Sequence, residues 1–175
     1  HFPIAHVGED ALKRYFLPNG RAAAQPYKML PMYKQVVSVA RQQVTMLANF
    51  VEVYLAREGH DGLVGVNLLA KVQLPNLASL CGAMLAGVDY VLMGAGIPRE
   101  IPGVLDALSE QRTASMKFDV EGMPAGELEI LSFDPADHGV DQSSPSKRSK
   151  FIAVVAATSL SAGRGRMANG RVDFY

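Results

Sequence analysis

The sequence lacks several features that would place it in a special class of protein. It has a single cysteine, Cys81, so no disulfide can form within the chain, and this is compatible with a reducing compartment. No apolar run approaches the roughly 18 residues that span a bilayer, and no signal peptide is visible at the N-terminus. The net charge is zero, so nothing indicates a nucleic acid or an anionic membrane as partner. We therefore expect a cytoplasmic protein that acts on a small molecule.

What the chain does have is enough apolar material for a core. Of its 175 residues 49% are hydrophobic and 19% are charged, which is typical of one folded domain of ordinary size. The chain begins at His1 without a methionine, and its last residues, GRVDFY, read as the start of a strand with nothing after it. We interpret the sequence as a piece of a longer protein.

The N-terminal part, residues 1–40, is predicted to be irregular with one short helix. Apolar residues at helical spacing favour a helix within GEDALKRYFL, which Pro18, Asn19 and Gly20 would end. Residues 42–48, QQVTMLA, are rich in β-branched and apolar side chains and are predicted to form a strand. Asn49 could then cap a helix over residues 50–58, although the β-branched content there leaves a strand as an alternative.

Residues 41–112 are predicted to form strand–helix units. A strand over residues 63–69 is apolar on both sides, which is typical of a parallel strand buried on both faces. A strand over 88–93 follows a helix that Gly87 ends, and Pro98 suits the first turn of the next helix. The stripes of the two helices are Leu77, Leu80, Cys81, Met84 and Leu85 in the first, and Ile101, Val104, Leu105 and Leu108 in the second.

Residues 113–149 change character, and residues 150–175 return to the earlier pattern. Near-alternation of apolar and polar residues over 115–133 predicts an inserted antiparallel hairpin, and residues 134–150 read as a mobile polar surface loop. A buried strand is predicted over 151–157, with Thr158 and Ser159 capping a further helix and the start of another strand behind it.

Strands that alternate with helices indicate an α/β fold with a parallel sheet. A doubly wound sheet and a (β/α)8 barrel both satisfy this pattern, and both collect ligands at the carboxyl ends of the strands. The residues to examine are therefore Asn67, the segment Gly94–Gly96, and the pair Thr158 and Ser159. Lys71 and Gln73 follow the first of these strands and are read as exposed loop residues that could also meet a substrate or a phosphate.

Three blocks, VGVNLL, VDYVLMGAGIP and FIAVVAATSLSAGRGRMANGRVD, resemble in their order the nitronate monooxygenase family, formerly the 2-nitropropane dioxygenases. The resemblance implies part of an FMN-dependent (β/α)8 TIM barrel that oxidises alkyl nitronates with oxygen. Flavin-dependent enoyl-thioester reductases of fatty-acid or polyketide synthesis share the pattern and remain an alternative. Residue by residue, the resemblance implies that the flavin lies against Asn67, Gly94, Ala95, Gly96 and Thr158.

The segments that carry the family's catalytic histidine and its phosphate-binding loops are not among these residues, so no catalytic base can be assigned. We interpret the four histidines of this chain as solvated or capping residues, and we expect no metal site. A truncated, non-catalytic barrel is the third interpretation, because a complete barrel usually needs about 250 residues. The candidate macromolecular partners are a second copy of the chain and the remainder of the barrel.

Overall fold

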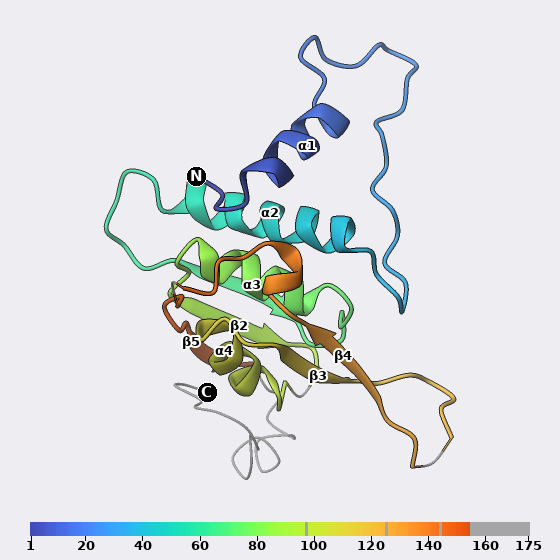
Figure 1. The fold of residues 1–175 in the computed structure, drawn as a ribbon, viewed down its shortest axis with the longest axis vertical. Helices are drawn as coiled ribbons and strands as arrows, with labels where there is room; N and C mark the ends of the chain where they lie inside the picture. The colour runs from blue at the N-terminus through green and yellow to red at the C-terminus, as the bar shows by residue number, and fades with distance from the viewer. Residues whose placement is uncertain (97, 125, 144, 155–175) are drawn as a thin grey trace.

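A computed structural model describes residues 1–96, 98–124, 126–143 and 145–154, and it shows an α/β arrangement (Figure 1). The described part holds a parallel sheet in the order β1–β2–β5, with β1 at Gly65–Leu69, β2 at Tyr90–Gly94 and β5 at Lys150–Ala153. A separate antiparallel pair joins β3, Ala114–Phe118, to β4, Glu129–Phe133. The helices are α1 (Ala5–Tyr15), α2 (Val39–Ala56), α3 (Asn76–Leu85), α4 (Ile101–Ser109) and the 3-10 turn η1 (Ala136–His138).

The parallel sheet is wound in one direction. The chain steps from β1 through α3 to β2, and from β2 through α4 and the β3–β4 pair to β5. Right-handed crossovers that step the same way across a sheet place their helices on the same face. Figure 1 shows α3 and α4 both in front of the sheet. The sheet thus has one helix-covered face, and its three described strands form no closed barrel.

The side chains of the sheet divide according to this arrangement. Because successive residues of a strand point to opposite faces, Val91, Met93 and Phe151 share the helical side and are fully buried. On the other face, Leu69 is 44% exposed and Asn67 is also exposed. The prediction that the strand over residues 63–69 is buried on both faces is therefore wrong. This strand, β1, lies at the edge of the described sheet, and no described helix covers its second face.

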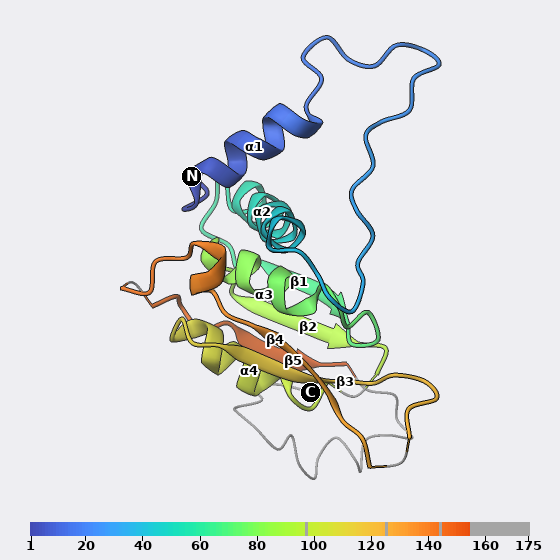
Figure 2. The same ribbon diagram turned by 45° about the vertical axis from the view of Figure 1, so that its right-hand side comes forward.

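The helices form layers outside the sheet, with α3 innermost, α2 over it and α1 outermost (Figure 2). Every residue of α3 from Asn76 to Met84 is buried. At Gly82 an added Cβ would lie 2.1 Å from the main-chain oxygen of Met46, so the backbones of α2 and α3 touch at this point. The glycine is required by this close approach, not by its backbone angles.

The strand predicted over residues 42–48 is wrong, because these residues lie in the middle of α2. Ser38 caps that helix and accepts a hydrogen bond from the backbone N–H of Arg41 at 3.3 Å. Asn49 is not a cap, since its side chain donates to the carbonyl of Thr45 at 2.9 Å within the helix. Residues Thr45, Met46, Phe50 and Val53 are buried at helical spacing, and packing on α3 overrides the β-branched composition.

The predicted helices over 76–86 and after Pro98, and the predicted hairpin, are confirmed. Gly87 ends the α3 segment with φ +78, and the stripe of α4 is buried at Ile101, Val104, Leu105 and Leu108. The prediction of a mobile polar loop over 134–150 is wrong at η1. There His138 is 4% exposed, stacks on Phe133 and contacts the Gln42 side chain at 2.8 Å. This loop packs against α2, so His138 is a buried and not a solvated residue.

Candidate functional site

A cleft of ≈ 660 Å³ lies beside the carboxyl ends of β1 and β2, the edge at which the sequence predicts a site. Its size falls within the usual range of sites for small molecules. Met93, Ile101 and Met116, all buried, supply an apolar floor. The walls come from the turn after β1, the turn after β2 and the end of β3.

The rim of the cleft is charged, and two of its cations are free to meet a ligand. Lys71 and Arg99 are exposed and have no hydrogen bond or ion pair with any residue that the structure describes. The third cation, Lys117, lies 3.4 Å from the carboxylate of Asp119. Glu100 accepts a hydrogen bond from the backbone N–H of Lys117 at 2.7 Å. The rim thus offers cationic side chains above an apolar floor.

Gln73 holds two walls of the cleft together. Its side-chain amide donates to the carbonyl of Asp119 at 3.2 Å, and its amide oxygen accepts from the backbone N–H of Asp119 at 3.0 Å. This pair of bonds imitates the pairing of two strands, so it fixes the hairpin against the turn after β1. Gln73 therefore has a structural role here in addition to lining the cleft.

The small residues after β2 are explained by the chain's own packing. An added Cβ at Gly94 would lie 3.1 Å from Cβ of Val154, and one at Gly96 would lie 3.0 Å from Cβ of Ala70. Gly96 has φ +147 and Ala95 has φ +53, so the bend passes twice through conformations that L side chains rarely adopt. In the structure, Val154 and Ala70 are therefore the residues that lie close to Gly94 and Gly96, respectively.

Asn67 and Gly94 lie on one face of neighbouring strands, whereas the cleft lies against the other face. Asn67 is aligned with Leu92, and Gly94 is aligned with Leu69, so all of them share the face that no described helix covers. Met93 points to the opposite face and lines the cleft. Of the residues predicted to contact a cofactor, only Gly96 lines the cleft, and Thr158 lies outside the described residues.

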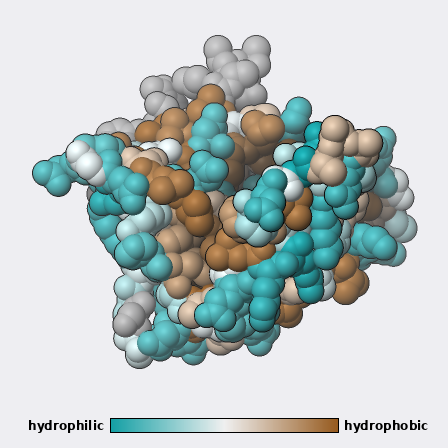
Figure 3. Space-filling view, turned by 90° about the horizontal axis from the view of Figure 1, so that it is seen from above, coloured by the Kyte–Doolittle hydropathy of each residue, from teal (hydrophilic) through white to brown (hydrophobic). Residues whose placement is uncertain are grey.

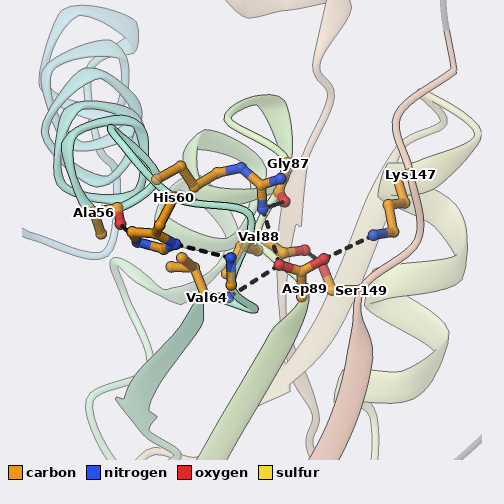
Figure 4. A network of polar contacts seen from close by, with 10 residues as sticks. Ala56, His60, Val64, Gly87, Val88, Asp89, Lys147 and Ser149 are labelled. Atoms are coloured by element: carbon orange, nitrogen blue, oxygen red, sulfur yellow. Dashed lines mark hydrogen bonds and ion pairs between the residues drawn. The ribbon is translucent and has the colours of Figure 1, made fainter.

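A second polar cluster lies at the amino ends of the strands, away from the cleft (Figure 4). Its centre is Asp89, which is 6% exposed and accepts hydrogen bonds from Lys147 at 2.7 Å, Arg57 at 2.9 Å and the backbone N–H of Val64 at 3.0 Å. The bond from Lys147 is the main cause that lowers the pKa of Asp89 to about 2. Sequence reasoning missed this cluster, because only the carboxylate in VDYVLM marks it and its partners are remote in sequence.

Neither a histidine nor the cysteine of the described part lines the cleft. His60 interacts with Ala56 and with the backbone N–H of Gly62, at the amino end of β1, and it does not line the cleft. Burial raises the pKa of the Cys81 thiol to about 12, so this thiol is not a nucleophile. Within the described residues no group of three or more histidine, cysteine or acidic side chains could hold a metal ion, and no helix there has the length and apolarity to cross a membrane.

Comparison with known proteins gives no family for this chain: no protein-family model, no curated protein and no solved structure matches it.

Proposed function

We propose that this chain is part of an FMN-dependent oxidoreductase built on a (β/α)8 barrel, of the kind that oxidises alkyl nitronates. The observation that carries the proposal is the winding of the sheet. Three parallel strands step in one direction with α3 and α4 on one face. A doubly wound sheet puts helices on both faces, whereas a barrel keeps them on the outside and fills its interior with side chains from the other face.

The exposed face of the sheet fits the interior of such a barrel. Leu69 and Val154 are 44% and 53% exposed on it, and further strands would cover them. Asn67 lies on this same face and is exposed, so it is the side chain that fits a polar edge of the flavin. Gly94 does not fit this role, because Val154 already occupies the space over it.

Bound FMN would supply the redox chemistry, and the protein would supply binding and orientation. In this chain the Asn67 amide would orient the ring by hydrogen bonding, and Leu69 beside it would exclude water. The cleft with Lys71 and Arg99 lies on the helical side of the same edge, so it is separate from the face assigned to the flavin. No group among the described residues is assigned as the base that would remove a proton from a substrate.

The first test is flavin binding by the purified chain. We expect FMN fluorescence to be quenched on titration, and we expect Asn67→Ala to weaken binding by about tenfold, the value of one good hydrogen bond to a ligand. Asn19→Ala, at an exposed position of the N-terminal segment, is the matched control and should bind like wild type. Wild-type protein that binds no FMN would refute the proposal and favour the non-catalytic alternative.

A second measurement separates the two enzymatic alternatives. Anaerobic addition of an alkyl nitronate should bleach the bound flavin without any other donor. If bleaching required a nicotinamide donor instead, the enoyl-thioester reductase alternative would replace the proposed activity.

A further inference from the structure

Charge is divided unevenly along the chain, although its total is zero. The chain has 17 basic and 17 acidic residues, and residues 11–51 contain six of the basic ones and none of the acidic ones. The rest of the chain therefore holds 11 basic and 17 acidic residues. The basic stretch includes the long connection between α1 and α2, residues 16–38, which we call the basic arm. In both ribbon views it extends beyond the body of the molecule (Figures 1 and 2).

The basic arm carries large apolar side chains that are mostly exposed. Met29 is 82% exposed, Met32 79% and Val36 88%. Seen from above, apolar side chains stand at the surface of the molecule between polar ones (Figure 3). The cations of the basic arm are Arg21, Lys28 and Lys34. They are exposed and form no ion pair with any described residue. Exposed apolar groups interleaved with unpaired charge mark a surface for a partner.

The root of the basic arm is fixed, so the arm is presented in a defined direction. The guanidinium of Arg41 donates to the carbonyl of Pro31 at 2.8 Å and lies 4.4 Å from the centre of the Tyr33 ring. The hydroxyl of Tyr33 is hydrogen-bonded to Thr45 of α2 at 2.6 Å. Pre-organisation of this kind lowers the entropic cost of binding a partner.

The opposite charge is concentrated on the tip of the β3–β4 hairpin. Residues 119–124 and 126–130, the acidic tip, contain four acidic side chains and no basic one. Glu121 and Glu127 are exposed and have no ion pair among the described residues. Val120, Leu128 and Ile130 of this tip are 41%, 58% and 49% exposed. The acidic tip therefore combines exposed apolar groups with negative charge, which is complementary to the positive charge of the basic arm.

We propose that the basic arm of one copy of this chain docks on the acidic tip of a second copy. The outer bend of the arm lies at the top of the molecule and the hairpin tip at the lower right in both ribbon views, whereas the last residues of the arm return toward α2. No ion pair among the described residues joins the arm to the tip of the same chain. When two copies lie antiparallel along the long axis of the molecule, the arm of each copy reaches the hairpin tip of the other. Such a two-fold dimer makes the same contact twice. The proposed partner of the basic arm is therefore a second copy of this chain.

The test is a charge swap measured by sedimentation equilibrium. The arm variant carries Arg21→Glu, Lys28→Glu and Lys34→Glu, which changes the charge of the arm from +3 to −3. The tip variant carries Asp119→Lys, Glu121→Lys and Glu127→Lys, which changes the charge of the tip from −4 to +2. All six positions are exposed, so neither variant should disturb the fold. We expect wild type to dimerise with a dissociation constant that rises about tenfold between low and high salt. Each variant alone should self-associate at least about tenfold more weakly, because its arm and tip then carry the same sign.

Recovery is the decisive measurement. An equimolar mixture of the two variants should dimerise like wild type, and so should a chain that carries all six substitutions, because a negative arm then meets a positive tip or a positive arm meets a negative tip in both contacts. Glu52→Lys with Glu58→Lys, at exposed positions in α2 and just after it, is the control and should not change association. A monomeric wild type, or variants that fail to recover when mixed, would overturn the proposal. Binding of a monomeric wild type to phosphatidylserine vesicles would assign the arm to a membrane surface instead.

Discussion

Replacing Asp89 by asparagine tests the polar cluster that joins the amino ends of β2 and β5. The pKa of Asp89 lies at about 2 instead of 3.8, because the carboxylate accepts bonds from Lys147, from the backbone of Val64 and from Arg57. A lowering of this size corresponds to at most about 2.4 kcal/mol of stability. Lys147 and Arg57 are 66% and 40% exposed, so solvent screens these contacts. We therefore expect a loss of about 1–2 kcal/mol at pH 7.

The pH dependence gives the sharper result. A carboxylate whose pKa is lower in the folded than in the unfolded state stabilises the fold fully above the unfolded value, here near 3.8, and loses this effect as the pH falls toward 2. The difference between wild type and Asp89→Asn should therefore be constant from pH 7 to pH 5 and fall to about half at pH 3. Urea unfolding followed by circular dichroism measures it, with the exposed Asp61→Asn as control. An equal difference at pH 7 and pH 3 would refute the electrostatic explanation.

Two further substitutions test the packing. Gly82→Ala should destabilise the protein by at least about 3 kcal/mol in urea, because its methyl group would collide with the backbone of Met46, whereas Gly8→Ala in α1 meets nothing and should be neutral or slightly stabilising. Equal effects of the two would mean that α2 and α3 are not in backbone contact. His138→Ala should cost about 2 kcal/mol through lost stacking and the lost contact with Gln42; a change within about 0.5 kcal/mol would show that η1 contributes nothing to stability.

The sequence predicted well the elements whose pattern of apolar residues fits only one type of secondary structure. Leu77, Leu80 and Met84 recur at helical spacing, and Gly87 marks the end of the segment, so α3 follows from local rules alone. The β3–β4 hairpin follows equally from alternation on both sides of a glycine-rich turn. In both cases the local preference and the tertiary packing point the same way.

Residues 42–48 show where local rules stop. Their composition favours a strand, yet Thr45 and Met46 are buried as part of a helical stripe that continues into residues after Asn49. Short apolar windows fit both periods, and the contact with α3 decides between them. His138 was misread for the same reason, since its polar surroundings in sequence say nothing of Phe133 and Gln42, which bury it.

The cleft lies at the strand edge that the sequence singled out, and three residues named from the sequence, Lys71, Gln73 and Gly96, line it. The edge of the sheet and the exposed cation Lys71 follow from the rule that ligands gather at carboxyl ends of parallel strands. The glycines at 94 and 96 seemed to leave room for a ligand, whereas the chain itself fills that room with Val154 and Ala70. Sequence alone cannot distinguish these two causes of a small residue, because the neighbour that comes close is remote along the chain.

The placement of the two polar clusters has a consequence for how this protein could diversify. Asp89 and its partners secure the strands at one end, and Lys71 and Arg99 line the rim of the cleft at the other end. Groups that share no contacts usually contribute independently to free energy. New preferences for a ligand could thus arise by exchange at the rim while the opposite end goes on supporting the same scaffold.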